Sequence, residues 1–205
     1  YIGKNPTKLK NSYCILRFNF SGINTETEET TMFGFKEKVS ISIYGFTKRY
    51  GIDFFVNPEQ TVEGILKSLI EAFSIQKPND KIYVIIDEYD HFANELLGFY
   101  PENFRSLVSK NGRVRKWYEV LKEGTETVID RIFITGVAPI TLDSLTSGFN
   151  IGKDISQDED YNDMMGFTKE ELVGILNNQE ISMEEQTKIL PIMKENYDGY
   201  KFCLN

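Results

Sequence analysis

The sequence predicts an α/β protein built on a parallel β-sheet. Two short, mostly apolar runs, residues 82–86 (IYVII) and 131–135 (RIFIT), show no regular alternation with polar residues, which indicates strands covered on both faces. Helical patterns separate the predicted strands in the order strand, helix, strand, helix, strand. Crossover connections of this kind make neighbouring strands parallel.

Composition places the chain among folded globular proteins. It has 205 residues, of which 40% are hydrophobic and 26% charged, enough for one large domain or a domain with a small appendage. A net charge of −8 argues against a domain whose main task is to coat nucleic acid. Cys14 and Cys203 lie far apart among apolar neighbours, so we expect reduced structural thiols and neither a disulfide nor a metal site.

The sequence also predicts where the protein resides. No apolar run approaches the ~20 residues that cross a bilayer, and the first residues carry no signal-peptide pattern. We therefore expect a cytoplasmic protein without a membrane contact. The chain opens on Tyr1, which suggests a piece of a longer polypeptide.

The first predicted strand covers residues 13–20 (YCILRFNF) and ends at the Ser21–Gly22 turn. A polar stretch then enters a long, loosely amphipathic segment that continues to Tyr50. Gly51 ends this segment in the manner of a helix C-terminus.

A clearer helix is predicted over residues 57–73. Asn57 is expected to cap it, and Pro58 is expected as its first helical residue. Apolar residues recur on one face of this helix. The turn KPND, residues 77–80, then leads into the strand 82–86.

Two further helical stretches are predicted before the third strand. Pro101 opens the first, and residues 111–124 (NGRVRKWYEVLKEG) form the second, with Gly124 beyond its end. The third strand, 131–135, ends in Thr135 and Gly136.

The pattern changes from about Asp154 onward. Residues 167–196 predict a small helical, lid-like subdomain, because the pairs Thr168–Glu171 and Ser182–Glu185 each fit a capping box before a helical pattern. We accordingly divide the chain into an α/β core, 1–160, and a helical subdomain, 161–205.

Polar side chains follow the two apolar strands. In an open parallel sheet, ligands bind beyond the carboxyl ends of the strands. Asp87 is suited to hold Mg²⁺ through its water shell, and Glu88 to orient and deprotonate a water that attacks a γ-phosphate. Thr135 would place a hydroxyl beside the same crevice. The structural alternative is that acids cap a strand end and that Thr135 merely ends a strand.

Four segments together resemble the bacterial AAA-ATPase-like family, whose members often carry a C-terminal PD-(D/E)XK nuclease-like domain. The segments are VIIDE at 84–88, FITGVAPITLDSLTSGFNI at 133–151, MMGFTKEEL at 164–172 and NYDGYKF at 196–202. The resemblance implies a P-loop NTPase-like core that uses ATP and Mg²⁺. It makes Asp87 the Walker B magnesium ligand, Glu88 the catalytic glutamate and Thr135 the sensor.

The chain departs from this family in lacking a Gly-Lys-Ser/Thr phosphate loop. Gly3-Lys4-Asn5 and Gly152-Lys153-Asp154 have neither the glycine spacing nor the hydroxyl. The resemblance implies that the loop lies upstream, so we expect these residues alone to hold no cofactor, to bind ATP poorly and to hydrolyse it negligibly. The missing strand would lie between 131–135 and a short strand expected at 154–156. Its loss predicts self-association, or a locally disordered or rearranged region near 136–160.

Two functions from different classes follow. The first is the ATPase module of a larger protein, in which nucleotide turnover drives an attached effector domain such as the nuclease-like one. The second is a non-hydrolysing interaction scaffold, which the absent phosphate loop favours. A nuclease role for this chain itself ranks third, because the required acidic and Glu-x-Lys pattern is not evident.

The remaining candidates have a structural interpretation that we favour. His91, the single histidine, is expected in a loop near the acids. The basic cluster Lys110, Arg113, Arg115 and Lys116 is expected on a solvated helix face. Its functional alternatives are an arginine, Arg113 or Arg115, that reaches a neighbouring subunit's γ-phosphate, or a contact with nucleic acid.

Overall fold

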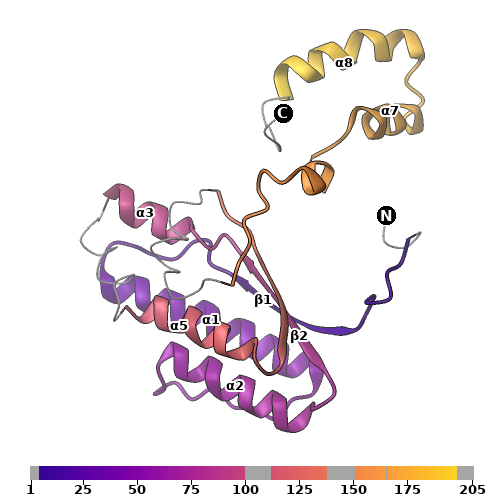
Figure 1. The fold of residues 1–205 in the computed structure, drawn as a ribbon. Coiled ribbons are helices and arrows are strands. Elements are labelled where there is room, and N and C mark those ends of the chain that lie inside the picture. The colour runs from indigo at the N-terminus through magenta and orange to yellow at the C-terminus, as the bar shows by residue number, and fades with distance from the viewer. Residues whose placement is uncertain (1–4, 100–111, 138–150, 165, 198–205) are drawn as a thin grey trace. The chain divides into compact units, whose positions relative to one another are not determined.

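A computed structural model describes residues 5–99, 112–137, 151–164 and 166–197 of the chain (Figure 1). The chain divides into two compact units, Tyr1–Ile151 and Gly152–Asn205. The first unit holds the predicted sheet and the second holds helices only among its described residues.

Three parallel strands form the sheet of the first unit. They are β1 (Tyr13–Asn19), β2 (Lys81–Asp87) and β3 (Ile129–Ile134), in the order β1-β2-β3. Asn19 pairs with Asp87 and Ile86 pairs with Ile134, so the three carboxyl ends meet at one edge of the sheet. The predicted parallel α/β arrangement is confirmed.

Helices bury one face of the sheet. The buried strand residues alternate with more exposed ones along β1 and β2, as Leu16, Phe18, Val84 and Ile86 show. On the opposite face Ile15 is 37% exposed, and Tyr83 and Ile85 are half-buried. The prediction that both faces are covered is therefore confirmed on one face only within the described chain. The apolar residues of the other face produced the unalternating pattern.

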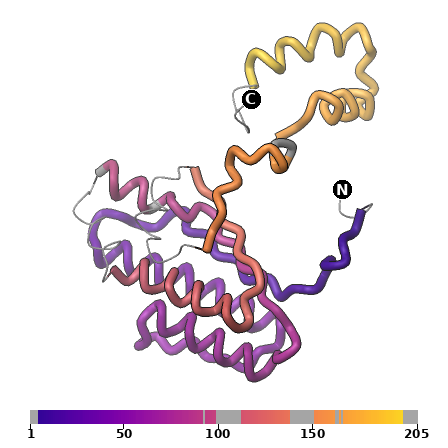
Figure 2. The backbone as a smooth tube through the Cα atoms, in the orientation of Figure 1, coloured from indigo at the N-terminus to yellow at the C-terminus, as the bar shows by residue number. Residues whose placement is uncertain are grey.

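The helical layer consists of α1 (Glu28–Tyr50), α2 (Val62–Gln76) and α5 (Arg113–Gly124), which lie on one side of the strands (Figure 1). The helix α2 contacts both α1 and α5, as the course of the backbone also shows (Figure 2). Apolar side chains from these helices interlock with those of the strands. Trp117 of α5 is central, with the rings of Phe18, Phe20 and Phe35 edge-on at 4.9, 5.6 and 5.5 Å between centroids.

The outer edge of β1 is closed by a side chain. The N–H of Ile15 donates a hydrogen bond to Tyr50 Oη at 2.9 Å. Tyr50 is the last residue of α1, and Gly51 ends the helix in the left-handed conformation with φ 63°, as the sequence predicts. On the other side of the sheet, β3 pairs only with β2 among the described strands.

The predicted start of α2 is wrong. The helix begins at Val62, and the N-cap is Thr61, whose Oγ1 accepts a hydrogen bond from the N–H of Gly64 at 3.3 Å. Asn57 instead turns the chain, since its Oδ1 accepts from the N–H of Glu59 at 3.0 Å. Asn side chains favour both caps and turns, so the local sequence did not separate these outcomes.

Between β2 and α5 the structure contains a helix that the sequence did not predict, α3 (His91–Phe99). His91 is thus the first residue of a helix and not a loop residue. The helix predicted from Pro101 lies outside the described residues. In α5 the predicted inward side chains, Val114, Trp117 and Leu121, are all buried, and Gly124 is its last residue.

The second unit contains a short 3₁₀ helix, η1 (Glu159–Met164), and the helices α7 (Lys169–Asn178) and α8 (Met183–Tyr197). The predicted strand at 154–156 is not formed. Asp154 Oδ1 accepts a hydrogen bond from the N–H of Ser156 at 2.9 Å, a local turn that competes with extended pairing.

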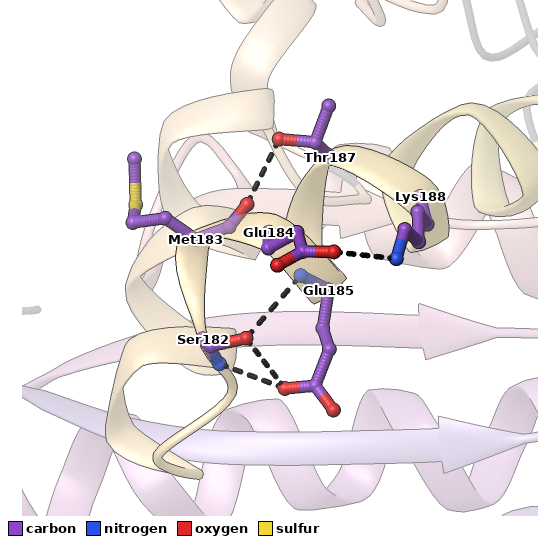
Figure 3. A network of polar contacts seen from close by, with 6 residues as sticks. All are labelled: Ser182, Met183, Glu184, Glu185, Thr187 and Lys188. Atoms are coloured by element: carbon purple, nitrogen blue, oxygen red, sulfur yellow. Dashed lines mark hydrogen bonds and ion pairs between the residues drawn. The ribbon is translucent and has the colours of Figure 1, made fainter.

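Both predicted capping boxes are present. Thr168 and Glu171 bond each other's backbone N–H at the start of α7. At α8, Ser182 Oγ accepts from the N–H of Glu185 at 3.3 Å, and Glu185 Oε2 accepts from the N–H of Ser182 at 3.1 Å (Figure 3). These bonds satisfy backbone donors that a helix start otherwise leaves free.

Cys14 is buried in β1, and burial raises the pKa of its thiol. Cys203 lies outside the described residues. None of the described helices combines the length and the apolarity needed to span a membrane.

The capping box of α8 gives a first test. Ser182→Ala removes the acceptor for the N–H of Glu185, so amide hydrogen exchange in the first turn of α8 should accelerate about threefold to tenfold. Lys188→Ala is the control, because it removes an exposed pair with Glu184 (2.8 Å) in the same helix and should change exchange less than about twofold. Equal effects of the two substitutions would show that the box does not hold the helix start.

Candidate functional site

The predicted residues Asp87 and Thr135 meet at the carboxyl ends of β2 and β3. The hydroxyl of Thr135 donates a hydrogen bond to Asp87 Oδ1 at 2.7 Å. The N–H of Thr135 donates to the carbonyl of Ile86 at 2.8 Å, which extends the pairing of the two strands by one residue. The parallel register therefore places both side chains on the same face of the sheet.

A third strand contributes a residue that we did not predict. Arg17 of β1 donates from a guanidinium nitrogen to Asp87 Oδ2 at 2.8 Å. Arg17 lies on the same face of the sheet, because it is two residues before Asn19, the partner of Asp87. A long side chain that leans along its strand spans this diagonal.

The two partners keep Asp87 ionised. The hydrogen bond from Thr135 and then that from Arg17 lower the pKa of the Asp87 carboxyl below its ordinary value. Each carboxylate oxygen thus has a protein donor. About a third of the Asp87 side chain is still exposed (33%), so the group remains accessible to solvent.

Glu88, the predicted catalytic glutamate, has a left-handed backbone with φ 56°. This conformation costs a residue other than glycine about 1–2 kcal/mol. Backbone strain of this kind concentrates at functional sites. The carbonyl of Glu88 accepts from the N–H of His91 at 3.2 Å, whereas its half-buried carboxylate has no hydrogen-bond partner among the described residues.

Asp90 is a buried acid with a structural task. Its carboxylate accepts from the N–H of Val137, at 3.1 Å for Oδ1 and 2.9 Å for Oδ2, and from Asn94 Nδ2 at 2.8 Å. The N–H of Tyr89 also donates to the carbonyl of Thr135 at 3.2 Å. The turn after β2 is thereby fastened to the segment that leaves β3, which fixes Thr135 beside Asp87.

Gly136 is required at this junction by close packing. A Cβ atom at this position would lie 2.3 Å from Asp90 Oδ1 and 2.4 Å from the ring of Tyr89. Neither neighbour is free to move, because Asp90 is held by several donors and Tyr89 is buried. The glycine at the end of β3 thus permits the approach of the two loops.

The other candidate residues, His91 and the basic cluster, form no hydrogen bond or ion pair with Asp87 among the described residues. The Nδ1 atom of His91 is buried and has no hydrogen-bond partner in the part of the chain that the structure describes. Arg115 pairs with Glu119 at 3.2 Å, and Arg113 lines an open hollow at the N-terminal ends of α1, α2 and α5. Asp87, Glu88 and Thr135 do not line that hollow, so a ligand bound there would not contact Asp87. Lys110 lies outside the described residues.

The side chains at the strand ends supply only part of the ligand set that magnesium needs. Asp87 would offer the carboxylate oxygen that Mg²⁺ prefers, with water and phosphate completing its shell. The described chain contains no group of three or more His, Cys, Asp or Glu side chains that could hold a metal. Within those residues, an ion at Asp87 would thus take most of its ligands from water or phosphate and few from the protein.

Comparison with known protein families identifies the family of this chain. A family model, AAA-ATPase-like, described as predicted AAA-ATPase, matches residues 1–146. This range contains all three strands and every residue of the strand-end site. The chain matches no curated protein and no solved structure.

Close packing at Gly136 yields a stability prediction. Gly136→Ala should lower the free energy of unfolding by about 1–3 kcal/mol, because the added methyl group forces the Asp90 turn away. Gly45→Ala is the matched control: it lies in α1 with no atom within 4 Å of the added carbon, and it should raise stability by about 0.5–1 kcal/mol. Urea denaturation measures both. A neutral Gly136→Ala variant would refute the packing account.

The backbone of Glu88 gives a second comparison. Glu88→Gly should be about 0.5–1 kcal/mol more stable than Glu88→Ala, since only glycine adopts φ 56° without strain, and its larger unfolded-state entropy offsets part of the gain. Thermal unfolding of the two variants measures this difference. A more stable alanine variant would mean that Glu88 leaves the left-handed conformation.

Proposed function

The chain belongs to the predicted AAA-ATPase family, and on this basis we propose that it forms one half of an ATP-hydrolysing site, the half that the strand ends supply. The observation that carries the proposal is the 2.7 Å hydrogen bond between Thr135 and Asp87, followed directly by the strained Glu88. An acid, a second acid and a hydroxyl at adjoining strand ends are among the groups that phosphoryl transfer to water needs.

Each residue has a distinct role in this proposal. Asp87 would hold magnesium through the metal's water shell, and the ion would neutralise charge on the phosphates. Glu88 would accept a proton from the attacking water and orient it, which suits a carboxylate that forms no other hydrogen bond among the described residues. Thr135 would keep the Asp87 carboxylate in one orientation and present its hydroxyl to the same crevice.

The site as proposed needs a partner segment. The 205 residues contain no Gly-Lys-Ser/Thr loop, which would supply backbone amides and a lysine to the β- and γ-phosphates. We propose that a segment upstream in the parent polypeptide supplies this loop, and that the present residues alone do not turn over ATP. An effector domain in the same polypeptide and self-association of the chain belong to the same proposal.

A non-hydrolysing scaffold is the second candidate. Two observations favour it: protein donors already occupy both oxygens of Asp87, and β3 has one edge without a partner among the described strands. An open strand edge accepts an added strand from a partner protein through its backbone groups.

Calorimetric titration of MgATP into the parent polypeptide decides between the two candidates. We expect binding, and we expect Glu88→Gln to reduce hydrolysis at least about 100-fold while the Kd for MgATP stays within about threefold. Glu126→Gln, an exposed change of the same type before β3, should alter neither quantity.

No binding of MgATP by the parent polypeptide would defeat the ATPase function and favour the scaffold. Binding with full hydrolysis in the Glu88→Gln variant would keep the ATPase but remove Glu88 from its catalytic role.

A further inference from the structure

Arg17 is the least expected member of the strand-end site. Its guanidinium lies 2.8 Å from Asp87 Oδ2, and its side chain is 63% exposed. Asp87 is its only partner in the described chain. An exposed ion pair adds little to the stability of a fold, so Arg17 can leave Asp87 at little cost in stability.

The location of Arg17 conflicts with the role proposed for Asp87. A magnesium ion that uses this carboxylate would lie within a few ångströms of the guanidinium, and two cations at that separation repel each other. Thr135 holds the opposite oxygen, Oδ1, and is uncharged, so it does not oppose the metal. The competition is therefore confined to Oδ2.

We propose that Arg17 is a positioning residue that competes with the divalent cation for Asp87. It neutralises the carboxylate when no metal is bound, and it swings into solvent when magnesium arrives with its phosphate ligands. The exposed side chain gives up no other described bond when it moves. This inference rests on the proposed function, because it takes Asp87 as the metal-binding residue.

Manganese binding to the 205-residue chain tests the proposal without ATP turnover. Electron paramagnetic resonance measures free Mn²⁺ at low ionic strength, where screening is weak. We expect Arg17→Gln to bind Mn²⁺ at least about tenfold more tightly than the unmodified chain. Arg17→Lys keeps the charge and should bind Mn²⁺ within about threefold of the unmodified chain.

Two control variants separate local competition from general effects. Arg131→Gln removes the same charge from a 58% exposed arginine of β3 that pairs with Asp130, and it should change the Mn²⁺ affinity less than about twofold. Asp87→Asn in the Arg17→Gln background should abolish the gained affinity. Thermal unfolding should show that Arg17→Gln leaves stability nearly unchanged.

The outcomes distinguish this inference from the proposed function. An unchanged affinity in Arg17→Gln, the same gain in Arg131→Gln, or no measurable Mn²⁺ binding by either the unmodified chain or Arg17→Gln would overturn the competition. If Arg17→Gln binds more tightly but Asp87→Asn does not remove that binding, the metal lies elsewhere. The assignment of Asp87 in the proposed function then fails together with the inference. If Asp87→Asn abolishes binding while Arg17→Gln leaves it unchanged, only the inference about Arg17 fails.

Discussion

The parallel pairing of β2 with β3 is the constraint on which the strand-end site depends. Because Ile86 pairs with Ile134, the residues that follow, Asp87 and Thr135, lie side by side. Two backbone hydrogen bonds continue this pairing past the end of β3, from Thr135 to Ile86 and from Tyr89 to Thr135. The side-chain contact between Asp87 and Thr135 is thus a result of backbone geometry, and the buried Asp90 fixes the loops that carry it.

Elements with strong local signals were predictable from the sequence. The apolar runs of β2 and β3, the stop at Gly51 and the two capping boxes depend on neighbouring residues, and all are present. Elements without such signals were not. Asn57 was mistaken for a cap because the same side chain serves turns, and α3, which begins directly after Asp90, was not predicted.

The residues of the site also fall into those that the sequence predicts and those that it does not. Asp87, Glu88 and Thr135 follow apolar strands directly, so their positions could be read along the chain. Arg17 could not be found, because its contact depends on which strand lies beside β2 and in which register. The structural task of Asp90 could not be predicted from the sequence either. Its burial depends on the segment after β3, which lies more than forty residues further along the chain.

The closure of β1 by Tyr50 makes the two borders of this sheet unequal. At the β1 border, the backbone N–H of Ile15 already donates to the phenol oxygen of Tyr50 in α1. At the other border, β3 pairs only with β2 among the described strands. Among the described residues, an additional strand would therefore meet a backbone donor that is already bonded beside β1 and a strand border without a partner beside β3.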